Sequence, residues 1–194
     1  MSNIVLKGSS SGDVTLTVPA AAGTNTVTVP AETGTVITTA SNTGKILQVV
    51  SSILQSEASS TTQIPFDNTI PQNNEGAEFT TAAITAAHAD NKFHVSVFAQ
   101  VSSNGNTGRV IVGLFIDSTA NALATAATQV SNSGGMITIA FDFIADAGDT
   151  SEHTFKMRYG RPDATTAFVN RTGSDLDLGN TISSGIVIRE INTQ

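Results

Sequence analysis

Short stretches in which apolar and polar residues alternate follow one another along most of the chain. The two nearest the N-terminus, at residues 16–24 and 27–35, are near-copies of one phrase in which Thr alternates with aliphatic residues before a Pro and then a Gly. Alternation is the period of an extended strand, Pro ends ladder pairing and Gly permits a turn. Each copy has one narrow apolar stripe, which cannot offset the ordering of its own backbone. We therefore expect neighbouring chains to supply the layer that covers these strands.

The character of the sequence changes at residue 45, so we predict two parts. Residues 1–44 are predicted to form an extended N-terminal arm that ends in the linker Ser41-Asn42-Thr43-Gly44, and residues 45–194 to form a head with longer strands. In the arm, the apolar and Pro positions expected to anchor it are Val18, Pro19, Val29 and Pro30.

The head shows the spacing of an all-β fold. Alternation predicts strands at residues 46–54, 93–101, 109–116, 136–144, 153–159, 167–170 and 186–191. Residues 78–87 are a weaker candidate, because their Ala and Thr content also suits a helical turn. Eight or so strands separated by Gly-rich and Asn-rich joins predict an antiparallel jelly roll or β-sandwich.

One predicted strand is apolar on both faces. Residues 109–116 carry aliphatic or aromatic side chains on both parities, whereas a strand in a single sandwich should have one wet face. We therefore place a trimer interface on this strand and assign it to Val110, Val112 and Phe115. Full burial of each would contribute roughly 1.5–3 kcal/mol. The alternative is that a loop or the arm covers this face within one subunit.

Composition narrows the classes of partner. The chain has 39% hydrophobic and 13% charged residues, which is typical of a β-rich domain with an aliphatic core. Its net charge of −7 and its nine scattered Lys and Arg residues argue against nucleic acid and anionic membranes as partners. The N-terminus lacks the features of a signal peptide and no segment reaches transmembrane length, so we expect synthesis in the cytoplasm.

Residues suited to catalysis or metal binding are sparse in this sequence. His88, His94 and His153 lack the close spacing of a metal pair, and His94 and His153 are expected at sheet edges. Asp175 and Asp177 are the best local candidates for calcium, although solvated turn carboxylates explain them as well. We find no nucleophile elbow and no phosphate-binding loop. The prediction is a protein that is not an enzyme and that has no metal or cofactor.

Two segments carry a resemblance to a known group of proteins. The Gly-Ser-Ser-Ser-Gly and Val-Thr-Leu-Thr-Val-Pro-Ala pattern within residues 8–35 resembles N-terminal segments of tailed-phage virion proteins. The opening Gly-Lys-Ile-Leu-Gln-Val-Val at residues 44–50, followed by a β-rich domain, resembles the jelly-roll heads of that group, which are similar in plan to the trimeric tumour-necrosis-factor and C1q type. The resemblance implies a homotrimer on the surface of a phage particle, made in the host cytoplasm.

Two functions follow from that resemblance. The first is a capsid decoration (cement) protein, whose arm would bind the major capsid protein by strand addition. The short chain favours it, because the sequence has no coiled-coil, collagen-like or β-helical shaft. The alternative is a tail-fibre tip or receptor-binding protein, which would contact tail proteins and a host surface glycan. Tyr159 is the single Tyr and Trp is missing, which weighs against sugar binding.

Overall fold

The described residues of this computed structural model are almost entirely β-strand and turn. They are residues 4–7, 11, 13–16, 45–104, 107–131, 135–173 and 178–193. The chain divides into two units, Met1–Thr38 and Thr39–Gln194. In the first unit, β1 (Ile4–Lys7) and β2 (Asp13–Leu16) pair as an antiparallel hairpin. The expected anchoring residues lie outside the described residues: Val18, Pro19, Val29 and Pro30.

The second unit contains ten strands and one short 3-10 turn among its described residues. Alternating patterns form most of these strands, as the buried and exposed positions along them show. The elements, in chain order, are β3 (Ile46–Leu54), β4 (Ala58–Ser60), β5 (Ala77–Thr85), β6 (Lys92–Ser103), β7 (Gly108–Ile116), β8 (Ala124–Val130), β9 (Ile137–Asp146), β10 (Glu152–Gly160), β11 (Ala167–Val169), η1 (Leu178–Asn180) and β12 (Ser184–Ile191).

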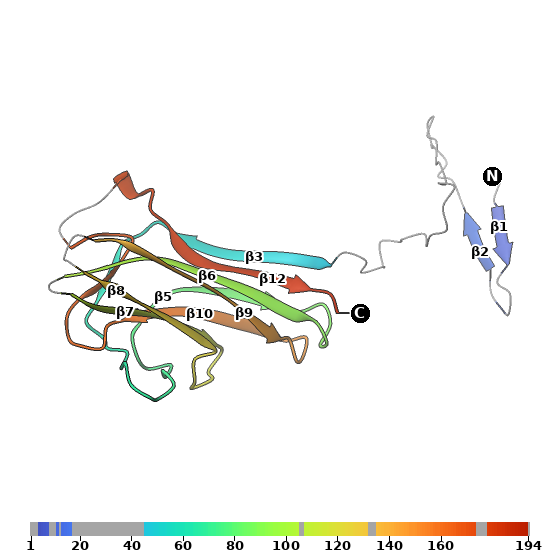
Figure 1. The fold of residues 1–194 in the computed structure, drawn as a ribbon. Helices are drawn as coiled ribbons and strands as arrows, with labels where there is room; N and C mark the ends of the chain where they lie inside the picture. The colour runs from blue at the N-terminus through green and yellow to red at the C-terminus, as the bar shows by residue number, and fades with distance from the viewer. Residues whose placement is uncertain are drawn as a thin grey trace. The chain divides into compact units, whose positions relative to one another are not determined.

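The eight long strands form two antiparallel sheets in jelly-roll order. One sheet has the order β5-β10-β7-β8, and the other has β3-β12-β6 with β9 on the free side of β6 (Figure 1). The short strands β11 and β4 extend the second sheet beyond the end of β12. Because the chain crosses repeatedly between the sheets, each sheet mixes early and late strands, as in a double Greek key. The predicted all-β antiparallel jelly-roll sandwich is confirmed, and its trimeric state stays a prediction.

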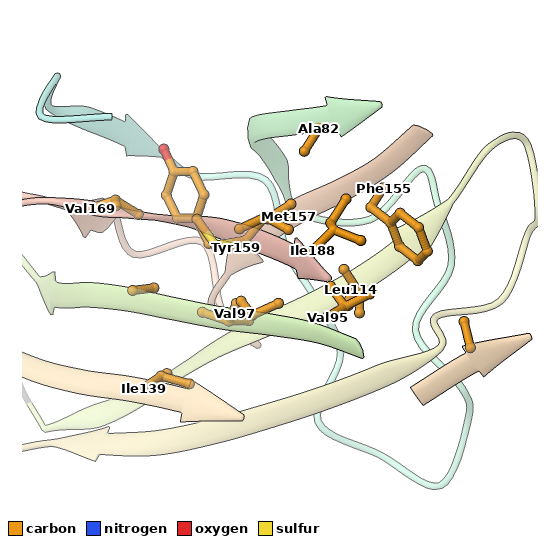
Figure 2. Close-up of a cluster of buried hydrophobic side chains, with 14 of the residues drawn as sticks. Ala82, Val95, Val97, Leu114, Ile139, Phe155, Met157, Tyr159, Val169 and Ile188 are labelled. Carbon is orange, nitrogen blue, oxygen red and sulfur yellow. The ribbon is translucent and has the colours of Figure 1, made fainter. Parts of the chain in front are cut away.

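The core lies between the two sheets and is built from the inward parity of each strand. Figure 2 shows Phe155, Met157 and Tyr159 of β10 in one cluster with Val95 and Val97 of β6. All five side chains are buried, and the rings of Phe93 and Phe155 meet edge to face with centroids 5.8 Å apart. The weaker candidate at residues 78–87 is the strand β5, whose alternate residues Ala82 and Ile84 complete the core.

Candidate functional site

The three predicted interface residues on β7 are all buried within one chain. Val110 and Val112 belong to the core between the sheets. Phe115 is on the opposite parity, and a Cβ added at Gly113 would come 2.9 Å from its ring, so Phe115 lies against its own strand. Because these side chains have no exposed surface to offer a partner, the trimer interface we expected there has no support from their positions.

A loop of the same chain explains why β7 is apolar on both faces. This covering loop consists of residues 63–76. Its two ends lie side by side, because the amide of Gly76 donates to the carbonyl of Gln63 at 2.8 Å. Such a compact loop with adjacent ends is an Ω-loop. It crosses the outer face of the β5-β10-β7-β8 sheet, with Ile64 packed against Gly160 and other loop residues beside Ile111. This is the alternative that the sequence left open.

Polar contacts hold the C-terminal part of the covering loop. Arg158, on the outer face of β10, donates from Nε to the carbonyl of Glu75 and from Nη2 to that of Gly76, both at 2.8 Å. Two residues before Glu75, Nδ2 of Asn73 donates to the carbonyls of Ser118 and Thr119 at 3.2 Å. The loop is therefore tied both to the sheet and to the turn between β7 and β8.

A pocket of about 250 Å³ lies between the covering loop and strands β7 and β8. It is lined by Pro65, Phe66, Asp67, Thr69, Pro71, Ile111, Thr125, Ala126 and Ala127. The Phe66 ring is 55% exposed, and the guanidinium of Arg109 lies 4.3 Å from its centroid. Asp67 accepts hydrogen bonds at Oδ1 from the amide and the hydroxyl of Thr69, at 2.8 and 2.6 Å. This site was not predictable from the sequence, because Phe66 resembles a core residue in a segment without periodicity.

The second surface with unusual composition is the edge strand β3. Within the described residues, its one strand partner is β12. Residues 46–54 contain no charge and no Pro, and Ile46, Val49 and Ile53 are each about half exposed, Val49 most at 57%. Natural edge strands usually carry charges, Pro or bulges that prevent pairing with other chains, and of these β3 has only a shift of register with β12 at Leu47. An edge strand of this composition is suited to contact another subunit.

The outer face next to β3 is formally neutral. Lys92 pairs with Asp146, and Nε2 of His94 lies 3.2 Å from Oδ1 of Asp142. Arg189 donates from Nη1 to Oγ of Ser96 at 3.0 Å. The outward positions of β12, β6 and β9 thus hold two basic residues and two acidic ones, with His94 counted as neutral. Although the chain has a net charge of −7, a contact between two copies at this face would add no net like-charge repulsion from these strands.

The two histidines expected at sheet edges lie on central strands. His94 is on β6, between β12 and β9, and His153 is on β10, between β5 and β7. His153 Nδ1 lies 2.9 Å from Oδ2 of Asp117, and its Nε2 lies 3.3 Å from Oδ1 of Asp149. The hydrogen bond with Asp117 is the main reason that the pKa of His153 is raised, against burial, which lowers it. These two contacts attach the turn after β7 and the turn before β10 to the same strand residue, His153.

The remaining candidate residues fall into two groups. Tyr159 is buried, and burial raises its pKa to about 12, so it offers no platform for a sugar. Asp175 and Asp177 lie outside the described residues.

In the described parts of the chain, no cluster of three or more His, Asp or Glu side chains is placed to hold a metal ion. The same residues contain no helix that is both long and apolar enough to cross a membrane.

Comparison with known proteins gave structural similarities alone. No protein-family model and no curated protein matched the sequence. Among solved structures, the chain is similar to the C-terminal domain of the sugar-binding protein EclA, at 13% identity and a TM-score of 0.34, over 60% of this chain and 74% of that one. It is also similar to the CBM22-1 xylan-binding domain of Xyn10C from Paenibacillus barcinonensis (11% identity, TM-score 0.35, 80% of this chain and 100% of that one).

A third similarity is to a chain of the infectious bursal disease virus Gt strain. The identity is 12% and the TM-score 0.39, over 97% of this chain and 46% of the viral one. Sugar-binding domains and a viral particle thus share a loose likeness to this chain. Likenesses this loose indicate no function for this chain.

Proposed function

We propose that this chain is a non-enzymatic structural protein of a virion surface, a homotrimeric capsid decoration protein whose N-terminal arm binds the major capsid protein. The sequence resemblance supplies the class of particle. The observation that supports assembly is the edge strand β3, which is uncharged along residues 46–54 and exposes three aliphatic side chains.

We place β3 beside the three-fold axis of the trimer. Side chains on a symmetry axis meet their own copies from the other subunits, so a strand without charge avoids like-charge contacts there. Burying the exposed half of Ile46, Val49 and Ile53 would contribute roughly 1 kcal/mol per side chain. The neutral outer face adjoining β3 keeps the acidic chains from repelling one another at the contact.

Sedimentation at micromolar concentration tests the trimer and its axis together. The full chain is expected to sediment as a trimer, and the double variant Val49→Lys with Ile53→Lys as a monomer, because six ammonium groups would surround the axis. Ile144→Lys is the matched control, since Ile144 is 49% exposed on β9, at the opposite edge of the same sheet. A monomeric or dimeric wild-type chain would contradict the trimer, and a trimeric double variant would contradict the position of the axis.

Copy number in the purified particle tests the location. Quantitative mass spectrometry is expected to find this chain at a stoichiometry comparable to that of the shell protein. A handful of copies would instead support the second candidate, a tail-fibre tip or receptor-binding protein. The pocket beside Phe66 is the observation that favours this alternative, because it offers an exposed aromatic ring next to hydroxyls and a carboxylate.

A further inference from the structure

We infer that the pocket between the covering loop and β8 binds a single neutral sugar residue. This inference goes beyond the assembly role and holds wherever on a particle the protein sits. A volume of about 250 Å³ is just below the roughly 300–1,000 Å³ of sites for larger ligands, and the small side chain of Ala127, on the outer parity of β8 with Ile111 opposite it, leaves this space open.

The pocket is held open by contacts that do not depend on a ligand. Arg158 and Asn73 fix the C-terminal part of the covering loop, the amide of Ile64 fixes its start by donating to the carbonyl of Arg161 at 2.9 Å, and Thr69 closes a turn onto Asp67. The amide of Ala122 also donates to the carbonyl of Pro71 at 2.9 Å, which joins the loop to the segment before β8. A preformed site loses little conformational entropy when a ligand binds.

The lining pairs an aromatic ring with oxygen groups. Phe66 contributes the ring, and Thr69 and Thr125 contribute hydroxyls. Both hydrogen bonds from Thr69 end on Oδ1 of Asp67, so among the described residues Oδ2 remains available to accept from a ligand. A sugar ring matches this arrangement, because it has an apolar C–H face for the aromatic ring and hydroxyl groups at its rim.

Other classes of ligand fit less well. An anion would meet the Asp67 carboxylate on a chain of net charge −7, while the nearby guanidinium of Arg109 already lies over the Phe66 ring. A purely apolar ligand would cover Asp67 without satisfying it, which is costly. A metal ion would find one carboxylate where calcium needs six or more oxygen ligands. A neutral molecule with several hydroxyl groups remains.

Saturation-transfer NMR on the full chain tests the inference with defined probes: methyl glycosides of glucose, galactose and mannose, and N-acetylneuraminic acid as the anionic comparison. At least one neutral glycoside is expected to bind with a millimolar dissociation constant, with transfer strongest at its ring C–H protons. The acidic sugar is expected not to bind. If no neutral glycoside binds, or if the acidic sugar binds as well as the neutral ones, the inference is overturned.

Matched variants locate the binding. Phe66→Ala is expected to raise the dissociation constant about tenfold, and Asp67→Asn by a similar factor, since each removes one of the two recognition elements. Ile70→Ala is the control, because Ile70 is on the same loop and 54% exposed but does not line the pocket. It should change the dissociation constant less than about twofold. Binding that survives Phe66→Ala would place the sugar elsewhere and overturn the assignment.

Discussion

Glu190 on β12 accepts a hydrogen bond of 2.6 Å from Nδ2 of Asn91, and neither side chain reaches solvent. The same carboxylate accepts from the amide of Ala87 at 2.7 Å and from Nε2 of Gln48 at 2.6 Å. The turn between β5 and β6 is thereby joined to β3 and β12. A buried charge is tolerated here because several donors satisfy it.

Glu190→Gln is expected to lower the free energy of unfolding at pH 7 by about 1.5–3 kcal/mol. The substitution removes the charged acceptor, and the NH₂ group of the new glutamine side chain would face one of the donors that now bind the carboxylate. Chemical denaturation measures this loss. Glu152→Gln, at an exposed position of β10, is the control and should change stability by less than about 0.5 kcal/mol.

Acid should remove the advantage of Glu190. Burial raises the pKa of Glu190, but the hydrogen bonds from Asn91, Gln48 and Ala87 together lower it by more. The pKa is therefore lowered overall. The stabilisation is therefore complete above the pKa of glutamate in the unfolded chain, about 4.3, and is lost as pH falls through the lower folded pKa. The difference between wild type and Glu190→Gln should shrink over that range. A difference that stays constant from neutral to strongly acidic pH would contradict this role.

His153 should make stability depend on pH in the opposite direction. Its pKa is raised by the hydrogen bond with Asp117, while burial opposes this and the charges of Asp117 and Asp149 add to it. The stabilisation is complete below the unfolded pKa of about 6.5 and is lost as pH rises through the higher folded pKa. We expect wild type to lose about 1 kcal/mol over this range, and His153→Gln to lose much less. Thermal unfolding at several pH values measures both; equal slopes would contradict the prediction.

Gly160→Ala tests the close approach of the covering loop to β10. An added Cβ would come 2.7 Å from the carbonyl oxygen of Thr62 and 3.0 Å from Cγ1 of Ile64. Because that oxygen belongs to the backbone directly before the covering loop, this segment must shift, and we expect a loss of about 1–3 kcal/mol in urea denaturation. The same variant should weaken sugar binding at the pocket. An unchanged stability would show that the loop moves without cost.

Arg158→Met should loosen the covering loop while leaving the sandwich folded. The change removes two hydrogen bonds to the carbonyls of Glu75 and Gly76 and the contact with Glu78, whose Oε2 lies 3.6 Å from Nη1. Protease cleavage within residues 63–76 is expected to accelerate, whereas hydrogen exchange on β6 should not change. Lys156→Met, at the preceding outward position of β10, is the control. Equal cleavage of the two variants would contradict the clamp assigned to Arg158.

The long strands were predictable because their side chains alternate in size as well as in polarity. On β9, the inward residues Ile137, Ile139, Phe141 and Phe143 contrast with smaller or polar neighbours, and the strand lies within two residues of its predicted range. β8 was not predicted, because its inward positions include Ala124, Ala126 and Thr128, which differ little from the outward ones. The three-residue strand β4 is too short to show a period.

The candidate sites were largely not predictable from the sequence. The apolar outer face of β7 is compatible with cover by either a partner chain or a loop of the same chain. Residues 63–76 cover it because of contacts with residues distant in sequence, which the local pattern of β7 does not reveal. Phe66 and Tyr159 illustrate the same limit: one ring is exposed and the other buried, although each is an aromatic residue beside Pro or Gly. Local pattern specifies which residues share a strand face, whereas the order of strands specifies what lies against that face.

The central position of β12 affects how the head is synthesised. This strand pairs with β3 on one side and β6 on the other, yet it is translated after both. Until residues 184–191 leave the ribosome, β3 and β6 lack the strand that joins them, and the core they cover stays accessible to water. A fold dominated by such distant pairings closes slowly. The nascent head is therefore most open to aggregation just before its last strand arrives, when chaperone binding would protect it most.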